Sequence, residues 1–548
     1  MSRLTAIQRF IAEHTATLEP LQRALALAHW EAATTGSAEA SAQAARLEIA
    51  LRQLYADPTA YAQVRAWYEA EAAADDPLTA RQLTLLYLEY TGGQQDPATI
   101  EALTALEKEV RDEYTTYRAR LHGRPVSDNT LDQILAHETD STRLQEAWEA
   151  SKQIGQRVAD RVRELARRRN AAARRQGFRD HFQKSLRLAE IAEDRLFALL
   201  ATLEAETAAP FRAAKEALDA RLAARFGVTP ADLRPWHYGD RFFQNPPPAS
   251  TLDLDPLFAE RDLVALAVRT FDGLGFDVRP VLMRSDLYAR PGKNQHAFCT
   301  DIDRRGDVRI LCNLEPTARW LETLLHELGH AVYDRAIDPN LPYLLRTPAH
   351  LITTEAVALL LGRLVLQPDW LTAVAGVDRS WVAAQRAALA AQERLSRLIF
   401  LRWAMVVVHF ERALYADPDQ DLNRRWWDLV ERFQLVRRPE GRDAPDWAAK
   451  IHLALHPVYY QNYLLGELLA SQLAAVLRQR VGRLVDAPAV GAYLTAALFR
   501  PGARAVCWQL FGRMAPCRAY TRLGIGLPAR GRAAASGGFV WALAGRPR

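Results

Sequence analysis

Long amphipathic helical stretches are the feature of this sequence that most restricts its possible folds. From residue 1 to about residue 225, apolar residues recur at helical spacing, and polar turns such as ADDPLT and LHGRPVSDNT separate the stretches. Helical periodicity resumes at about Thr317 and continues to about residue 500. The sequence therefore predicts a mainly α fold.

A different pattern interrupts the helices at about residues 276–315. The segments DVRPVLMRSDLYA, NQHAFCTDI and DVRILCNLE are typical of short strands, and RPGK and DRRGD between them are typical of turns. We expect a small antiparallel β-meander here. Earlier, the aromatic and proline-rich segment RPWHYGDRFFQNPPPAS (234–250) predicts an ordered loop between two helical halves.

The net charge of +5 comes from the C-terminal end of the chain. Residues 518–548 contain six arginines and no acid, so the remaining 64 lysines and arginines face 65 acids. Because the body of the protein is nearly neutral, a nucleic-acid binder is not expected. We expect residues 518–548 to be a poorly ordered basic tail.

Cysteine usage and hydropathy indicate a cytoplasmic protein that does not enter a membrane. No cysteine pair has the C-x-x-C spacing of a metal site, and four cysteines in a chain of 548 residues suggest free thiols in a reducing compartment. The N-terminus lacks the apolar run of a signal peptide. The apolar segment 398–410 is too short to span a bilayer and predicts a buried helix. The cysteines are Cys299, Cys312, Cys507 and Cys517.

The segment LLHELGHAVYD contains the strongest chemical signal, a His-Glu-x-x-His motif within a predicted helix. Positions four apart share a helix face, so His326 and His330 can bind one metal ion. Glu327 then stands beside the ion without binding it. We expect Gly329 to allow close approach of a neighbouring element, because it has no side chain.

A catalytic zinc ion usually has three protein ligands, so a third must come from another element. Glu355 lies in an apolar helical stretch, where a carboxylate without a partner would be costly. His350, beside a proline near the start of this stretch, is the competing ligand. The alternative without a metal is an ion pair between Glu355 and an arginine such as Arg346.

The expected chemistry is peptide hydrolysis with one zinc ion per chain. Zinc lowers the pKa of a bound water and polarises a carbonyl group, and Glu327 would act as general base. The tetrahedral intermediate needs a further donor for its oxyanion. The segment KIHLALHPVYYQNYLL offers candidates for this role or for packing in the core, namely His452, His456, Tyr460 and Tyr463.

Together these segments resemble the zinc peptidases of the angiotensin-converting enzyme family and the thimet-type oligopeptidase family, over roughly residues 131–472. HAFC begins thirty residues before the first motif histidine, where these families have an edge strand that pairs with the substrate. GDVRILCNLEPTARWLETLLHELGH is similar to both groups. The resemblance implies two helical halves enclosing a deep channel, with an N-terminal half or lid at residues 1–225 and a catalytic half at residues 226–517.

The resemblance also implies a role for each matched residue. It makes His326, His330 and Glu355 the zinc ligands and Glu327 the general base. It places His296 and Ala297 on the substrate-pairing strand. It implies that Lys450 binds the C-terminal carboxylate of the substrate and that His452, or its rival His456, contacts the scissile region. It makes Tyr463 the oxyanion donor and Tyr460 a carboxylate contact.

Three functional hypotheses follow. The first is a zinc peptidase for short peptides, which releases C-terminal dipeptides or cuts internally as an oligopeptidase. The second is a zinc carboxypeptidase that removes single C-terminal residues. The third is an inactive peptide-binding protein on the same fold, although such a protein would have no chemical need of Glu327. The sequence does not indicate the oligomeric state.

Overall fold

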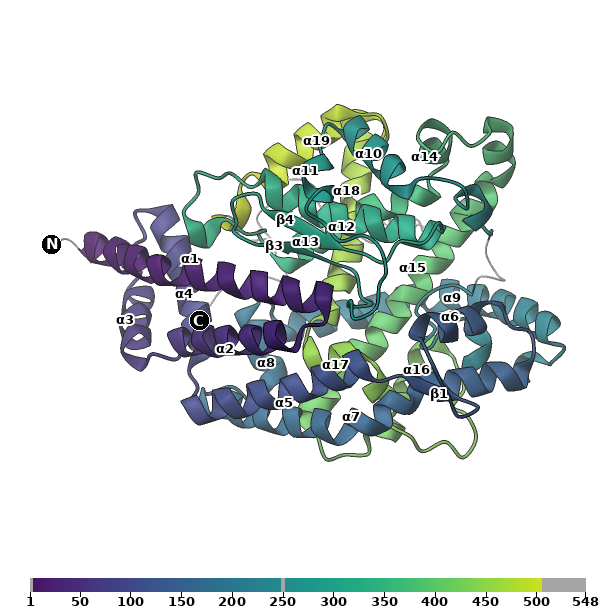
Figure 1. Ribbon diagram of the computed structural model, residues 1–548, viewed down its shortest axis with the longest axis horizontal. Helices are drawn as coiled ribbons and strands as arrows, with labels where there is room; N and C mark the ends of the chain where they lie inside the picture. The colour runs from purple at the N-terminus through teal and green to yellow at the C-terminus, as the bar shows by residue number, and fades with distance from the viewer. Residues whose placement is uncertain (1–2, 248–251, 505–548) are drawn as a thin grey trace.

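The computed structural model describes residues 3–247 and 252–504 of the chain. Within these ranges the protein is mainly α-helical, as the sequence predicts, and it contains two small antiparallel sheets of two strands each (Figure 1). The predicted basic tail at residues 518–548, together with Cys507 and Cys517, lies outside the described residues. Cys299 and Cys312 are free thiols, as expected.

Between residues 3 and 226 the structure contains nine α-helices. Three of them begin with an Asp-Pro pair, in which the aspartate accepts hydrogen bonds from the first turn and proline occupies the first helical position. These helices are α1 (Arg3–Thr35), α2 (Ala38–Tyr55), α3 (Pro58–Glu69), α4 (Pro77–Gly93), α5 (Pro97–Thr116), α6 (Asp128–His137), α7 (Ser141–Arg175), α8 (His181–Leu188) and α9 (Glu193–Phe226).

The described remainder of the chain contains ten further α-helices. These are α10 (Leu263–Leu274), α11 (Arg279–Leu282), α12 (Ala318–Ala336), α13 (Leu351–Gly362), α14 (Pro368–Ala373), α15 (Arg379–Ala416), α16 (Leu422–Gln434), α17 (Ile451–Leu455), α18 (Tyr460–Val481) and α19 (Pro488–Leu494). Helix α15 contains the predicted buried segment 398–410. Within the described ranges, none of the helices has the length and apolar character needed to span a bilayer.

The sheet near the zinc motif is smaller than the expected meander. Strands β3 (Phe298–Asp301) and β4 (Val308–Leu311) form an antiparallel hairpin beside α12. The expected first strand is wrong, because the segment contains α11, which has Pro280 in its first turn, and only an isolated bridge from Asp286 to Leu311. A second hairpin, β1 (Ala119–Leu121) with β2 (Arg124–Val126), lies where the sequence predicts only a turn.

One apolar core joins most of the described chain. It extends in sequence from Leu103 to Ala503 and includes residues on both sides of the proposed boundary near residue 225. That boundary falls at the end of α9, where Gly227 adopts a left-handed conformation with φ of +65°. A smaller apolar cluster lies among the N-terminal helices and includes Tyr90, and Tyr343 from the second half of the chain joins it.

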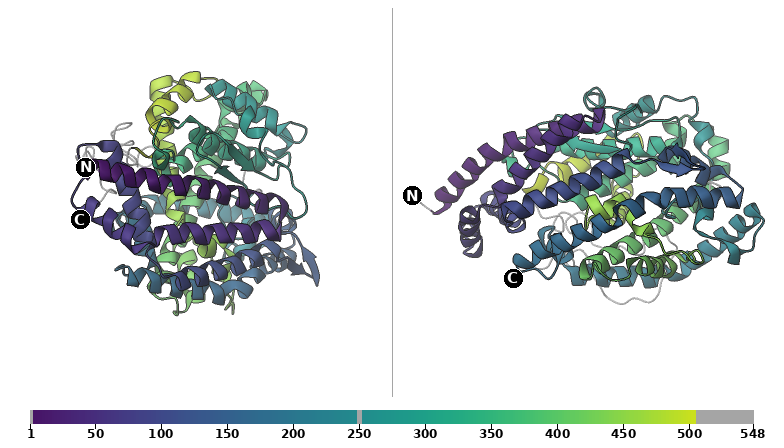
Figure 2. Two further views of the ribbon diagram at one scale, coloured as in Figure 1. Left: turned by 60° about the vertical axis from the view of Figure 1, so that its left-hand side comes forward. Right: turned by 60° about the horizontal axis from the view of Figure 1, so that its bottom comes forward.

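The N-terminal helices also contact the segment that leads into β3. Helices α1 and α2 lie side by side in all three views (Figure 2). At their connection, the carbonyl oxygen of Ala33 accepts a hydrogen bond from the Asn294 N–H at 2.8 Å. The Arg290 guanidinium donates to the carbonyl oxygen of Thr34 at 2.6 Å. The start of the chain thus contacts the predicted substrate strand.

Candidate metal centre and active site

The His-Glu-x-x-His motif lies on α12, which begins after Thr317. The Thr317 hydroxyl accepts a hydrogen bond from the backbone of Trp320, and one face of the helix buries leucines such as Leu324 and Leu328. The rings of His326 and His330 lie on another face, with their centroids 4.9 Å apart. The fold therefore presents both histidines in one direction, as the spacing of four predicts.

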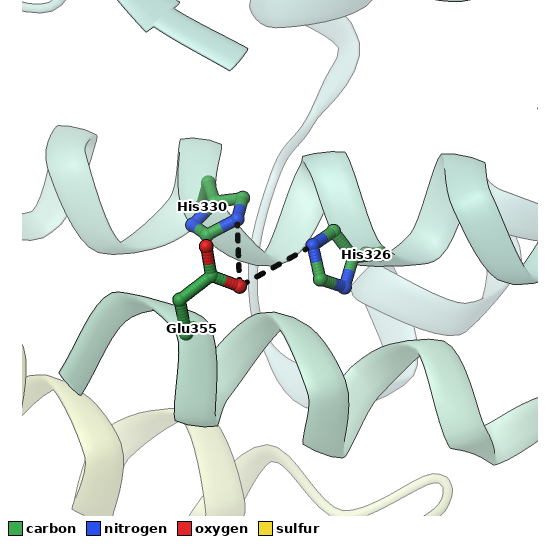
Figure 3. Close-up of side chains that lie close together, drawn as sticks. All are labelled: His326, His330 and Glu355. Carbon is green, nitrogen blue, oxygen red and sulfur yellow. Dashed lines mark ion pairs between the residues drawn. The ribbon is translucent and has the colours of Figure 1, made fainter. Parts of the chain in front are cut away.

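Helix α13 brings Glu355 to the two histidines. The side chain of Glu355 is 4 % exposed, and its Oε2 atom lies 3.7 Å from Nε2 of His326 and 3.9 Å from Nε2 of His330 (Figure 3). The close packing of α12 and α13 depends on Gly329, because a Cβ atom there would lie 2.8 Å from the Cα atom of Ala358. This is the close approach predicted for Gly329.

The electrostatics of these three side chains fit a bound cation. Burial lowers the pKa of His326 to about 4 and that of His330 well below its usual value, so both imidazoles are neutral. Burial raises the pKa of Glu355 to about 7, and its Oε2 atom has no hydrogen-bond partner among the described residues. Two neutral imidazoles and a carboxylate are a usual donor set for zinc. The three residues could therefore hold a metal ion.

His350, the competing ligand, and Arg346, the competing ion-pair partner of Glu355, both contact other groups. His350 is the N-cap of α13: its Nδ1 atom accepts a hydrogen bond from the backbone of Ile352, and its Nε2 atom lies 2.8 Å from the carbonyl oxygen of Ala189. Arg346 donates to the carbonyl oxygen of Leu341 at 2.6 Å. Within the described ranges, no arginine or lysine forms an ion pair with Glu355.

Two side chains that the sequence does not single out support two of the three possible ligands, His330 and Glu355. Thr354 Oγ1 lies 2.6 Å from Nδ1 of His330, so it orients that imidazole. The Tyr459 hydroxyl donates to Oε1 of Glu355 at 2.8 Å. Thr354 directly precedes Glu355 in the sequence, and this adjacency is the sequence signal that places it near the possible metal ligands. The Tyr-x-x-Tyr spacing selects its neighbour Tyr460 and therefore does not indicate Tyr459.

The predicted general base, Glu327, is 7 % exposed. Burial raises its pKa to about 8, and the nearby charge of Glu355 adds to the rise. A cation between Glu355 and the histidines would oppose this rise, because it favours the carboxylate form. Glu327 therefore lies in a desolvated position close to the charge of Glu355.

The two predicted tyrosines differ in their surroundings. The buried hydroxyl of Tyr460 accepts a hydrogen bond from Nε1 of Trp403 at 2.9 Å. The ring centroid of Tyr463 lies 5.1 Å from that of Tyr459. Burial, reinforced by the charge of Glu355, raises the pKa of Tyr463 well above its usual value. Tyr463 thus keeps its proton and can donate it in a hydrogen bond.

Lys450 lies at the start of α17 among aromatic rings. Its Nζ atom is 5.4 Å from the ring centroid of Tyr460 and 5.5 Å from that of Trp403. It donates to Oε1 of Gln244 at 3.2 Å, and no acid within the described ranges forms an ion pair with it. Gln244 was not selected from the sequence. The charge of Lys450 contributes to the lowered pKa of His452.

The two candidate histidines, His452 in α17 and His456 directly after it, have different surroundings. The ring of His452 lies 6.1 Å from that of Tyr463, and its Nδ1 atom is buried without a partner among the described residues. His456 is exposed, and its ring lies 5.7 Å from that of His452. The geometry therefore brings His452, rather than His456, beside the tyrosine.

His296 and Ala297 directly precede β3, two residues and one residue before its first residue, Phe298. Asn294 fixes this segment, because its Oδ1 atom accepts a hydrogen bond from the His296 N–H at 2.9 Å. His296 is exposed, yet desolvation is the main cause that lowers its pKa, followed by the charge of Lys450.

A family model described as angiotensin-converting enzyme matches residues 2–196 and 259–486. The second of these segments includes α12, α13 and the start of α18, and therefore all three possible metal ligands. A search of curated proteins gave no match.

Proposed function

Because the chain belongs to the angiotensin-converting enzyme family and is a zinc-dependent peptidase, we propose that it releases C-terminal dipeptides from short peptides. In this proposal His326, His330 and Glu355 hold one zinc ion per chain, and the other predicted residues position the peptide. The oligopeptidase and carboxypeptidase modes are the alternatives that an experiment must distinguish.

Lys450 is the observation that carries the proposed mode of cleavage. Its ammonium group lies among aromatic rings, with the uncharged Gln244 as its hydrogen-bond acceptor and without an acidic partner among the described residues. A cation in such surroundings favours an anionic ligand, and the C-terminal carboxylate of a peptide supplies that charge. A fixed cation near His452 would select peptides by the distance from their C-terminus to the scissile bond.

A channel between the two halves of the chain is part of this proposal. Glu89 on α4 and His296 before β3 are both exposed, yet desolvation is the main cause of their pKa shifts, upward for Glu89 and downward for His296. This combination is expected of side chains that line a water-filled recess inside a protein. It supports a channel with one wall from each half, residues 1–225 and 226–517.

The residues of the chain would divide the reaction between them. Zinc, when bound, supplies Lewis acidity toward a carbonyl oxygen and a water molecule. Glu327 takes a proton from the attacking water and delivers it to the leaving amine. Tyr463 donates its O–H to the oxyanion, and His452 stands beside it. His296 and Ala297 pair with the substrate backbone, while Lys450 holds the terminal carboxylate.

Product analysis tests the proposal directly. A peptide of six residues with a free C-terminus, and the same peptide with a C-terminal amide, are incubated with the zinc-loaded protein and analysed by mass spectrometry. Dipeptide release from the free peptide alone supports the proposal. Single released residues would indicate a carboxypeptidase, and equal internal cleavage of both peptides would indicate an oligopeptidase.

The matched control is Glu327→Gln, which preserves size and removes the base. We expect this variant to retain zinc and to lose about 10²- to 10⁴-fold in peptide hydrolysis. Full activity of the wild-type protein after chelation, with no zinc detected, would overturn the proposal. Zinc binding without hydrolysis of any peptide in a varied panel would instead favour an inactive peptide-binding protein.

A further inference from the structure

The two carboxylate oxygens of Glu355 have different surroundings. Oε1 accepts the hydrogen bond from the Tyr459 hydroxyl at 2.8 Å. Oε2 faces His326 and His330 and has no hydrogen-bond partner among the described residues. The tyrosine therefore occupies one oxygen and leaves the other for a metal ion, as an outer partner of a metal ligand does.

The backbone that carries Tyr459 has an unusual conformation. Val458 has a φ of +54°, in the left-handed region that branched residues avoid, and the helix α18 begins only at Tyr460. Such a conformation persists only where the surroundings fix it, and it is often found at functional sites. The reversed backbone direction at Val458 places Tyr459 outside the helix and against Glu355.

Glu411 of α15 supplies the group that fixes this conformation. Its Oε1 atom accepts a hydrogen bond from the backbone N–H of Val458 at 2.7 Å, and Glu411 is only 1 % exposed. The side-chain amide of Gln461 donates to the carbonyl oxygen of Val458. Both backbone polar groups of Val458 are thus bonded to side chains, and each bond is buried.

We propose that Tyr459 is a positioning residue for the zinc site: its hydroxyl holds Glu355 so that a single carboxylate oxygen binds the metal. Glu411 in turn positions Tyr459 through its hydrogen bond to the backbone of Val458. The inference rests on the proposed function, because it takes Glu355 as a zinc ligand. Single-oxygen binding would leave a coordination position for water and for the substrate carbonyl, which a catalytic zinc ion requires.

Zinc affinity, measured without substrate, tests the role of Tyr459. Competition with a chromophoric chelator should show that Tyr459→Phe weakens zinc binding by about 10- to 100-fold, the usual effect of removing an outer partner of a metal ligand. The matched control is Tyr333→Phe on α12, whose hydroxyl lies 3.2 Å from Thr353 Oγ1. The control should bind zinc within about 3-fold of the wild type, because Thr353, its hydrogen-bond partner, is not one of the three possible ligands.

Glu411 is tested through a pair of variants. Glu411→Gln keeps an oxygen that can accept the Val458 N–H and should retain most of the zinc affinity, whereas Glu411→Ala should lose affinity as Tyr459→Phe does. The double variant Tyr459→Phe/Glu411→Ala should be no weaker than the weaker single variant, because both act on one contact. X-ray absorption of the zinc-loaded proteins adds the number of oxygen ligands as a second readout.

Three results would overturn the inference: unchanged zinc affinity in Tyr459→Phe, additive losses in the double variant, or equal losses in Glu411→Gln and Glu411→Ala. If Glu411→Ala does not fold, Tyr459→Phe still decides the first point. These outcomes are separate from a failure of the proposed function, in which the wild-type protein itself would bind zinc but release no dipeptide.

Discussion

Gly466 of α18 packs directly against the backbone side of Glu355: a Cβ atom at position 466 would lie 2.9 Å from the Cβ atom of Glu355. Because Gly329 of α12 packs equally closely on Ala358, helix α13 lies between two glycine contacts. The position of Glu355 therefore depends on the absence of a side chain at position 329 of α12 and at position 466 of α18.

We expect Gly466→Ala to lower the free energy of unfolding by about 1–3 kcal/mol, the usual cost of overpacking a core. It should also weaken zinc binding, since the displaced atom belongs to Glu355. Thermal unfolding with and without zinc measures both effects. The control is Gly92→Ala, where the added atom would meet only the Cδ1 atom of Leu188, at the end of a flexible side chain. Equal losses of stability and of zinc binding in the two variants would contradict this expectation.

Zinc removal should separate the two candidate third ligands. Zinc at 100 times its Kd stabilises a folded protein by about 2.7 kcal/mol, so a chelator should lower the Tm and added zinc should restore it. Glu355→Gln should abolish this shift. His350→Asn keeps a residue that can cap α13 and should preserve the shift and one zinc ion per chain. A zinc-dependent shift in Glu355→Gln would show that another group completes the site.

Lys450→Met should affect substrates according to their C-terminus. Without its cation, the protein should bind peptides with a free carboxylate more weakly, with KM raised about 10- to 100-fold, as for a charge-assisted contact of about 1.5–3 kcal/mol. Peptides with a C-terminal amide should be unaffected. The control Lys108→Met removes a surface lysine that pairs with Asp112. Equal losses for free and amidated peptides would rule out carboxylate recognition by Lys450.

Acid should destabilise the N-terminal helices through His14. Burial lowers its pKa from 6.5 to about 4, so the unfolded chain binds a proton at this residue before the folded protein does. Stability is therefore present above pH 6.5 and is lost as the pH falls toward 4. For this one residue the loss between pH 7 and pH 5 is about 2 kcal/mol.

Urea unfolding of wild type and His14→Phe at the two pH values measures this loss. The variant should lose about 2 kcal/mol less than the wild type between pH 7 and pH 5. His122→Gln, at a side chain that is 68 % exposed, should behave as the wild type does. If the free energy of unfolding depends on pH identically in all three proteins, protonation of His14 does not cause the loss of stability.

The sequence predicts the parts of the structure that depend on local pattern. The helix with the His-Glu-x-x-His motif, and the helical stretch that contains Glu355, follow from apolar spacing and from the cost of an unpaired buried carboxylate. The structure brings these side chains together, as expected of a metal site. Fold class was predictable for the same reason, since helical periodicity is a strong local signal.

Other features depend on contacts that no local pattern contains. The segment DVRPVLMRSDLYA resembles a short strand, but Pro280 suits the first turn of a short helix. The contact of Tyr459 with Glu355 depends on the left-handed conformation of Val458, which the sequence does not indicate because valine rarely adopts it. Gln244 contacts Lys450 across more than two hundred residues of sequence, so only the folded chain reveals the pair.

The connection between α1 and α2 has a consequence for how this chain can vary. Gly36 lies so close to the segment before β3 that a Cβ atom there would be 2.5 Å from the carbonyl oxygen of Gly292. Insertions at this connection, or any side chain at position 36, would shift the segment that carries His296. A change at this turn therefore requires a compensating change in the segment before β3, because the two backbones lie in direct contact.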